Sequence, residues 1–176
     1  MRNIIIYTRR LLLGVLTCAV APSIIAPPAA AEVPYPDISS YMSSGSLEKF
    51  KLVNMDGVWF TTPIGLRCGI GDDGRYGCSG TLPGALPDAN EISWYPGDAS
   101  SRLHRSDAPA FDSGRRQTLL GGGTVLAYRG SRCALTYDSA VYCINRDNLD
   151  SQMMVTPSMT RFGRLSLQGS AARAHQ

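Results

Sequence analysis

The sequence contains the cysteine frame G-x-R-C-x9-C twice, and no other feature constrains the fold as strongly. The first copy runs from Gly65 to Cys78 and the second from Gly130 to Cys143. The flanks of the two copies do not align well, so the repeat reflects either an internal duplication or two hairpins that acquired the same frame independently. In both cases the frame predicts two similar hairpins within one chain.

The spacing inside each frame predicts how the cysteines pair. In the first copy, Asp72-Asp73-Gly74 lies midway between the cysteines and fits a three-residue hairpin loop, which ends on a residue with positive φ. Counting back along both strands places Cys68 opposite Cys78, and the second copy likewise opposes Cys133 to Cys143. Opposed residues have Cα atoms about 4.5–5.5 Å apart, which a disulfide spans. The register therefore favours these two bridges over the other two connectivities.

The N-terminus has the three parts of a cleaved export signal. Arginines near the start precede the apolar run Leu11–Val20 and the alanines Ala29–Ala31. The run is shorter than the ~20 residues that a membrane-spanning helix needs, so we expect no transmembrane segment after cleavage. Paired arginines at 9 and 10 also fit the twin-arginine export pattern. We expect residues 1–31 to be removed and the protein to be secreted or held in the cell envelope.

Removing this signal changes the charge balance of the chain. The precursor carries 17 basic and 14 acidic residues, and three of the basic residues are arginines of the signal. The mature domain is therefore formally neutral, which argues against a nucleic-acid partner and against a membrane-surface role. The four mature cysteines form an even number, as expected for disulfides in an oxidising compartment.

The composition favours β structure in a single domain. Glycine and proline are frequent, and no long window has a clean apolar period of 3.6 residues. Short runs rich in β-branched and aromatic residues alternate with turn residues instead. The predicted strands are Phe50–Val53, Val58–Thr62, Leu66–Ile70, Arg75–Ser79, Glu91–Tyr95, Thr118–Leu120, Thr124–Tyr128, Cys133–Thr136, Ala140–Ile144 and Met153–Thr156.

These runs predict an all-β fold, either a small antiparallel sandwich or a partly open barrel with two disulfide-stapled hairpins. Residues 32–49 are predicted to form an N-terminal extension with a short helix after Asp37, whose side chain can cap it. The β domain is predicted to span residues 50–165, and a flexible tail residues 166–176.

Four stretches between Gly57 and Cys143 carry a family resemblance. They are GVWFTTPIGLRCGI, YGCSGTLPG, NEISW and the later Tyr128-x-Gly130-x-x-Cys133 with Cys143. In these motifs the chain resembles a family of small exported proteins of mycobacteria and related actinobacteria. The resemblance implies export, disulfides and a cell-envelope or extracellular setting, and it transfers no catalytic residue.

Candidate catalytic groups are few. His104 is the main candidate for a general base, because His175 lies in the predicted tail. In a small secreted hydrolase, His104 would act with Asp98, Asp107 or Asp112. The sequence has no G-x-S-x-G nucleophile elbow, however, and this favours a solvated loop residue at position 104.

The sequence also gives little support for a metal or cofactor. Nine residues separate the cysteines of each pair, whereas structural zinc sites usually have two to four between paired ligands. Asp56 and Asp72-Asp73-Gly74 lack the pattern of a calcium loop, and Gly121–Gly123 lacks the lysine of a phosphate loop. We therefore expect no metal and no cofactor.

The segment Pro83–Gln117, between the two hairpins, is the predicted partner-binding surface. It is rich in the side chains that dominate recognition energetics. The candidates are Trp94, Tyr95, Arg102, Arg105, Arg115 and Arg116. The alternative for these residues is that the aromatic pair belongs to the core and the arginines are solvated.

We therefore expect a secreted or cell-envelope binding module with an unknown ligand and an unknown envelope or extracellular partner. The alternative is the small hydrolase that uses His104. A concave pocket around His104, with a serine or carboxylate within ~3.2 Å, would favour the hydrolase.

Overall fold

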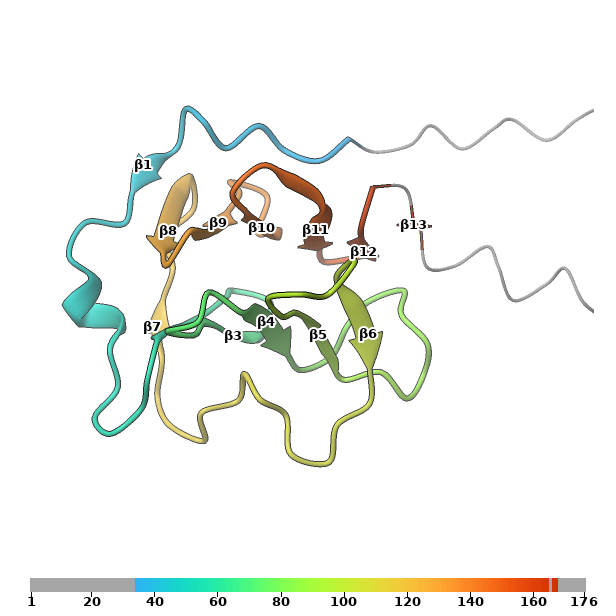
Figure 1. Cartoon of the computed structure of the whole chain (residues 1–176), viewed down its shortest axis with the longest axis horizontal. Coiled ribbons are helices and arrows are strands. Elements are labelled where there is room, and N and C mark those ends of the chain that lie inside the picture. Colours follow the sequence, from blue (N-terminus) through green and yellow to red (C-terminus); the bar gives the residue numbers. More distant parts are fainter. Residues whose placement is uncertain (1–33, 165, 168–176) are drawn as a thin grey trace, which may run out of the picture. The chain divides into compact units, whose positions relative to one another are not determined.

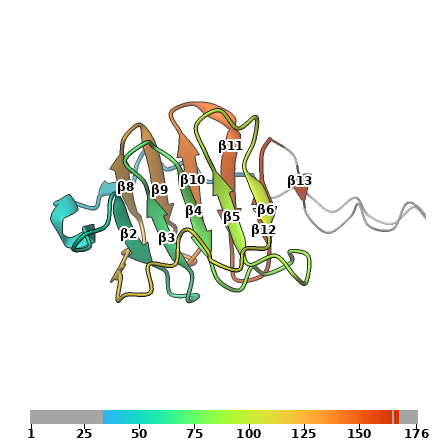
Figure 2. The ribbon, with the colours of Figure 1, turned by 60° about the horizontal axis from the view of Figure 1, so that its bottom comes forward.

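The computed structural model describes residues 34–164 and the backbone of Ser166–Leu167. The predicted export signal and most of the predicted tail lie outside the described residues. The described chain forms two β-sheets that share one hydrophobic core (Figure 1). Figure 2 shows the strands of one sheet stacked over those of the other. The fold is an all-β sandwich, as the sequence predicts, and the two sheets do not join into a barrel.

The first sheet has six strands and carries the first cysteine frame. Its order is β6-β5-β4-β3-β2-β7, and all neighbours are antiparallel except β7, which runs parallel to β2. The strands are β2 (Val58–Thr61), β3 (Arg67–Ile70), β4 (Tyr76–Ser79), β5 (Glu91–Trp94), β6 (Arg102–His104) and β7 (Thr118–Leu119).

The second sheet has seven strands and carries the second frame. Its order is β1-β8-β9-β10-β11-β12-β13, and only the pair β1–β8 is parallel. The strands are β1 (Met42–Ser43), β8 (Thr124–Tyr128), β9 (Ser131–Leu135), β10 (Val141–Asn145), β11 (Asn148–Val155), β12 (Thr160–Phe162) and β13 (Ser166–Leu167).

The two sheets repeat one topology. Strands β2 to β6 form an antiparallel meander, and strands β8 to β12 form a second one in the same order. Each meander is bordered by a short parallel strand from the other half of the chain. Strand β1 precedes β2 but pairs with β8, and β7 precedes β8 but pairs with β2. The repeat thus extends beyond the cysteine frame, which favours internal duplication, and the exchanged strands link the two sheets.

Both hairpins have the predicted register and both predicted disulfides. Cys68 pairs with Cys78, and Cys133 with Cys143, with Cα atoms 4.1 Å apart in each bridge. The first loop ends on Gly74 at φ 88°, which satisfies the expected left-handed position. Its counterpart in the second loop is Ser139 at φ 68°, so a residue with a Cβ takes the same conformation there.

The disulfides lie in the core between the sheets. All four bridged cysteines have no exposed surface and belong to one cluster of buried residues drawn from both sheets. Hydrogen bonds also join the sheets, because the Tyr76 hydroxyl donates to the carbonyl of Ser151 on β11. The Ser131 hydroxyl donates to the Gly74 carbonyl at 2.6 Å, so the turn of one hairpin contacts a strand of the other.

The N-terminal part of the domain differs from the prediction. Asp37 does not cap a helix: its carboxylate accepts a hydrogen bond from the Ser39 amide at 2.9 Å and closes only a turn. The predicted strand Phe50–Val53 is also wrong, because Phe50 ends a short 3₁₀ helix, η1 (Leu47–Phe50). Ser46 accepts a hydrogen bond from the Glu48 amide at 3.3 Å and caps this helix.

The domain is also longer than the predicted residues 50–165. Strand β1 begins before this range, and β13 follows it, and both pair with neighbours in the seven-stranded sheet. The sequence did not predict β1, β6, β12 or β13, each of which is two or three residues long.

Two buried tyrosines predict a loss of stability at high pH. Burial raises the pKa of Tyr142 to about 12 and also raises the pKa of Tyr76. Because the folded state favours the neutral phenols, the stabilisation is complete below about pH 10, the ordinary tyrosine pKa. It is lost as the pH rises towards 12. Urea unfolding at pH 8 to 11 should show a declining free energy, and the Tyr142→Phe variant should show a shallower decline. An unchanged free energy up to pH 11 would contradict the prediction.

Candidate binding site

The loop formed by residues 105–117 covers the outer face of the six-stranded sheet, the face turned away from the other sheet (Figure 1). Phe111 is its anchor, with a side chain only 1% exposed. The ring fills the space above Gly77, where an added Cβ would lie 2.4 Å from ring atom Cε2. The loop is therefore held on the sheet because residue 77 has no side chain.

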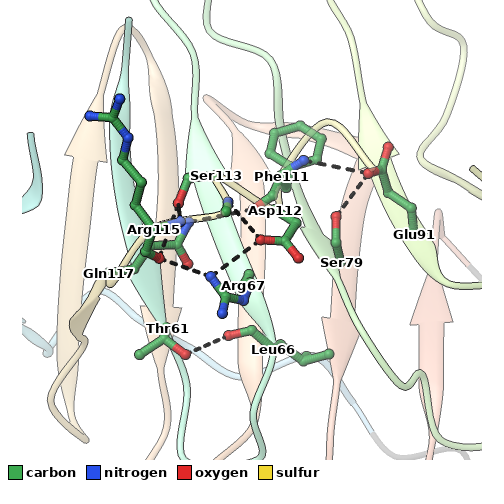
Figure 3. Close-up of polar contacts among 11 residues, drawn as sticks. Thr61, Leu66, Arg67, Ser79, Glu91, Phe111, Asp112, Ser113, Arg115 and Gln117 are labelled. Atoms are coloured by element: carbon green, nitrogen blue, oxygen red, sulfur yellow. Dashed lines mark hydrogen bonds and ion pairs between the residues drawn. The ribbon is translucent and has the colours of Figure 1, made fainter. Parts of the chain in front are cut away.

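The carboxylate of Glu91 on β5 ties the sheet to this loop. It is 1% exposed and accepts hydrogen bonds from the Ser79 hydroxyl at 2.8 Å and from the Phe111 amide at 3.4 Å (Figure 3). Its other oxygen lies 3.0 Å from Nε2 of His104. Burial, followed by the charge of Glu91, raises the pKa of the nearby Tyr95. Glu91 thus joins β4, β6 and the covering loop at one buried point.

Arg67, the arginine of the first cysteine frame, holds the other end of the loop. Its Nη1 donates to the carbonyl of Arg115 at 2.8 Å and lies 3.2 Å from the Asp112 carboxylate (Figure 3). Arg115 in turn donates from Nη1 to the Val53 carbonyl at 2.7 Å. A backbone carbonyl thus helps to position each of these two guanidinium groups, and only the charge of Arg67 is offset by a described carboxylate, that of Asp112.

These arginines line an open pocket of about 730 Å³ at the ends of β2 and β3. Three of its lining residues are arginines, and no described carboxylate lines it. The side chain of Arg116 is exposed and has no hydrogen bond or ion pair with the described residues. We call this site the arginine pocket. Its lining consists of Thr61, Gly65, Arg67, Arg115, Arg116, Gln117, Thr118 and Leu119.

No protein-family model, curated protein or solved structure matches this chain. The resemblance to the mycobacterial family therefore stays a prediction. The assignment of a site rests on the geometry of the arginine pocket and of its covering loop.

The structure separates the predicted contact arginines into three places. Only Arg115 and Arg116 line the arginine pocket. Arg102 lies over the Tyr95 ring, 5.7 Å from its centre, and 3.8 Å from the Asp98 carboxylate. Arg105 forms surface ion pairs with two aspartates, Asp88 at 3.9 Å and Asp107 at 3.6 Å. The segment 83–117 therefore does not present one continuous arginine surface.

The predicted aromatic contact residues have structural roles. Trp94 is buried in the core between the sheets, and its indole N–H donates to the Asp98 carbonyl at 3.2 Å. Tyr95 is half-buried and packs against Phe111, with ring centres 6.5 Å apart. The core alternative is thus correct for Trp94, and Tyr95 supports the covering loop.

His104 is not the solvated loop residue that the sequence indicated. It lies on β6 and bonds to Glu91, a carboxylate that the sequence did not suggest as its partner. The three predicted carboxylates contact other groups: Asp98 is near Arg102, Asp107 near Arg105 and Asp112 near Arg67. His104 also lines a smaller pocket of about 340 Å³, which contains no serine or cysteine in its lining.

Sequence reasoning missed Arg67, Gln117 and Glu91. The sequence offered one indication that Arg67 matters: both cysteine frames have an arginine directly before their first cysteine, and Arg132 takes this position in the second copy. Arg132 also donates to a backbone carbonyl, that of Arg146 at 2.9 Å. Both frame arginines therefore contact a neighbouring loop, and Arg67 also lines a pocket with two further arginines.

The described residues hold no cluster of three or more histidine, cysteine or acidic side chains that could bind a metal ion. In the part of the chain that the structure covers, no helix has the length and apolar character to cross a membrane.

Proposed function

We propose that this protein is a secreted or cell-envelope binding module, and that its partner contacts run through the arginine pocket. The observation that carries the proposal is an open pocket whose lining includes three arginines and no described carboxylate. Arginine forks pair with planar or tetrahedral anions, so the partner presents negative charge. The sandwich and its two buried disulfides supply a rigid frame for this surface.

The disulfides and the N-terminal sequence support the proposed setting. Disulfides form and persist mainly in oxidising compartments, and the N-terminal sequence has the order of charge, apolar run and alanines of a cleaved signal. We expect the mature protein from culture fluid or envelope to begin near Glu32. N-terminal sequencing tests this, and an exported form that retains residues 1–31 would contradict cleavage.

A capture experiment tests the role of the arginine pocket. The mature, disulfide-bonded protein is immobilised and exposed to envelope extracts at low salt, where contacts between exposed charges are strongest. Partners bound by the parent should be lost from the Arg115→Ala/Arg116→Ala variant. They should be retained by Arg102→Ala/Arg105→Ala, which removes the same charge from the same segment outside the pocket.

Thermal unfolding of both variants checks that they fold, because Arg115 also bonds to the Val53 carbonyl. If the folded pocket variant retains the same partners as the parent, the proposed function is wrong. If the control variant loses them as well, binding depends on net charge and not on the pocket.

The hydrolase alternative meets the criterion of a pocket at His104 with a carboxylate within hydrogen-bond distance. His104 is 3.0 Å from a buried carboxylate and lines a pocket, which is the arrangement of an oriented general base. Its second ring nitrogen, Nδ1, is buried, however, and has no hydrogen-bond partner among the described residues. The pocket lining also holds no serine or cysteine for His104 to activate, and its partner Glu91 accepts hydrogen bonds from Ser79 and Phe111, so we assign His104 to holding Glu91. Loss of a hydrolytic activity in a folded His104→Ala variant would reverse this choice.

A further inference from the structure

The charges around the arginine pocket leave an excess of two positive charges. Three arginines line the pocket, and Asp112, paired with Arg67, is the carboxylate that contacts one of them. The adjacent η1, whose Lys49 carbonyl accepts a hydrogen bond from Thr118, carries one charge of each sign, on Glu48 and Lys49, and leaves this excess unchanged. A phosphate monoester carries about −1.5 to −2 at pH 7, whereas a carboxylate carries only one negative charge. The charge balance therefore favours a phosphate monoester.

The pocket has donors without a described partner, and two of its three arginines, Arg67 and Arg115, are held in position. Both contacts of Arg67 use Nη1, so Nη2 and Nε have no partner among the described residues. Arg115 is fixed by the Val53 carbonyl, and Arg116 is unpaired beside it. Because guanidinium groups held before binding lose little freedom when they bind, this arrangement suits a ligand with several acceptor oxygens.

The size and lining of the pocket indicate what the phosphate is attached to. A volume of about 730 Å³ is far larger than a phosphate ion needs and falls in the range of pockets for organic ligands. Besides its arginines, the lining contains the polar side chains of Thr61, Gln117 and Thr118, and its one large apolar residue is Leu119. Such a wall suits a molecule that carries hydroxyl groups.

We infer that the arginine pocket binds the phosphate monoester of a polar, sugar-like molecule. This inference rests on the proposed binding function and names the ligand class of that same site.

Titration calorimetry on the mature, disulfide-bonded protein tests the inference with four probes. Glucose 6-phosphate should bind more tightly than inorganic phosphate, because its sugar also contacts the wall. Glucuronate has similar size but a single carboxylate charge, and should bind at least about tenfold more weakly, which corresponds to the loss of one charge-assisted hydrogen bond. Vesicles that contain phosphatidic acid present the same phosphate monoester on a lipid, and they test whether the pocket binds a lipid headgroup instead.

Two further measurements isolate the phosphate and the pocket. Lowering the pH from 7.5 to 5 should weaken glucose 6-phosphate binding several-fold, because the second phosphate pKa is about 6 and the lining arginines stay charged. Glucuronate binding should not change over this range. The Arg116→Ala variant should bind glucose 6-phosphate at least about tenfold more weakly. Arg102→Ala, outside the pocket, should change it less than twofold.

Three results would overturn the inference. Glucuronate binding as tight as glucose 6-phosphate would assign the pocket to carboxylates. Binding to phosphatidic acid vesicles without binding to glucose 6-phosphate would assign it to a lipid headgroup. An affinity for glucose 6-phosphate that Arg116→Ala leaves unchanged would place the ligand elsewhere. The binding function fails separately, when the folded Arg115→Ala/Arg116→Ala variant still captures the partners of the parent.

Discussion

Removing one disulfide is expected to lower the free energy of unfolding by about 2–4 kcal/mol, and removing both is expected to leave little of the folded state at 37 °C. The two bridges close loops of equal length, with ten residues of sequence separation in each, so the chain-entropy model gives them equal contributions. Two such losses together amount to much of the ~5–15 kcal/mol free energy of unfolding that is typical of a domain. Alanine in place of the buried cysteines also leaves cavities in the core.

Urea unfolding of three variants measures this effect. They are Cys68→Ala/Cys78→Ala, Cys133→Ala/Cys143→Ala and the combination of both. Because the bridges share one core, the combined loss should differ from the sum of the two single losses. A loss below about 1 kcal/mol for either pair would show that its bridge adds little to the folded state. Non-reducing peptide mapping checks the pairing itself.

The sequence predicted the parts of the fold that depend on local rules. Each hairpin is fixed by a turn of known geometry between two short strands, so counting from the turn was enough to pair the cysteines. Nine of the ten predicted strands overlap strands of the structure. They were recognised from another local rule, because β-branched and aromatic residues between turn residues are typical of strands. The exception, Phe50–Val53, has this composition but begins within η1.

The parts that the sequence did not predict depend on contacts between distant segments. Strand β1 has only two residues and lies beside β8 of the other half, and although β7 was predicted as a strand, its parallel pairing with β2 was not. The pairing of Glu91 with His104 follows from the register of β5 and β6, and β6 has no strand pattern of its own. Arg67 joins Arg115 and Arg116 only because the loop returns across the sheet.

The sequence therefore predicted only part of the candidate site. Arg115 and Arg116 were predicted as contact residues from their type and their place between the hairpins, and the structure puts both in the arginine pocket. The same reasoning selected Arg102 and Arg105 equally, because residue type does not show which way a loop folds. The position of the covering loop, which depends on the groups that hold it, determines which of these arginines line the pocket.

Glu91 is the buried group on which the placement of that loop depends. Replacing it with alanine removes the acceptor of the Ser79 hydroxyl, the Phe111 amide and the His104 ring. A buried polar group left without a partner costs about 1–3 kcal/mol, and the partly exposed His104 can regain water. We expect a loss of about 2–4 kcal/mol in the free energy of unfolding for Glu91→Ala. Glu91→Gln should cost less, because its amide oxygen can still accept one bond.

The Glu91→Ala change should also loosen the covering loop, in addition to lowering the stability of the fold. Since Phe111 loses the acceptor of its amide, hydrogen exchange of residues 105–117 should accelerate in Glu91→Ala. Capture through the arginine pocket should weaken too, although Glu91 does not line it, because Arg115 and Arg116 lie on the loop. Glu48→Ala is the matched control: this glutamate is exposed on η1, and its loss should change the free energy by less than about 0.5 kcal/mol. If Glu91→Ala unfolds like the parent and its loop exchanges at the parental rate, the carboxylate does not anchor the loop, and Phe111 in the space above Gly77 is sufficient to hold it.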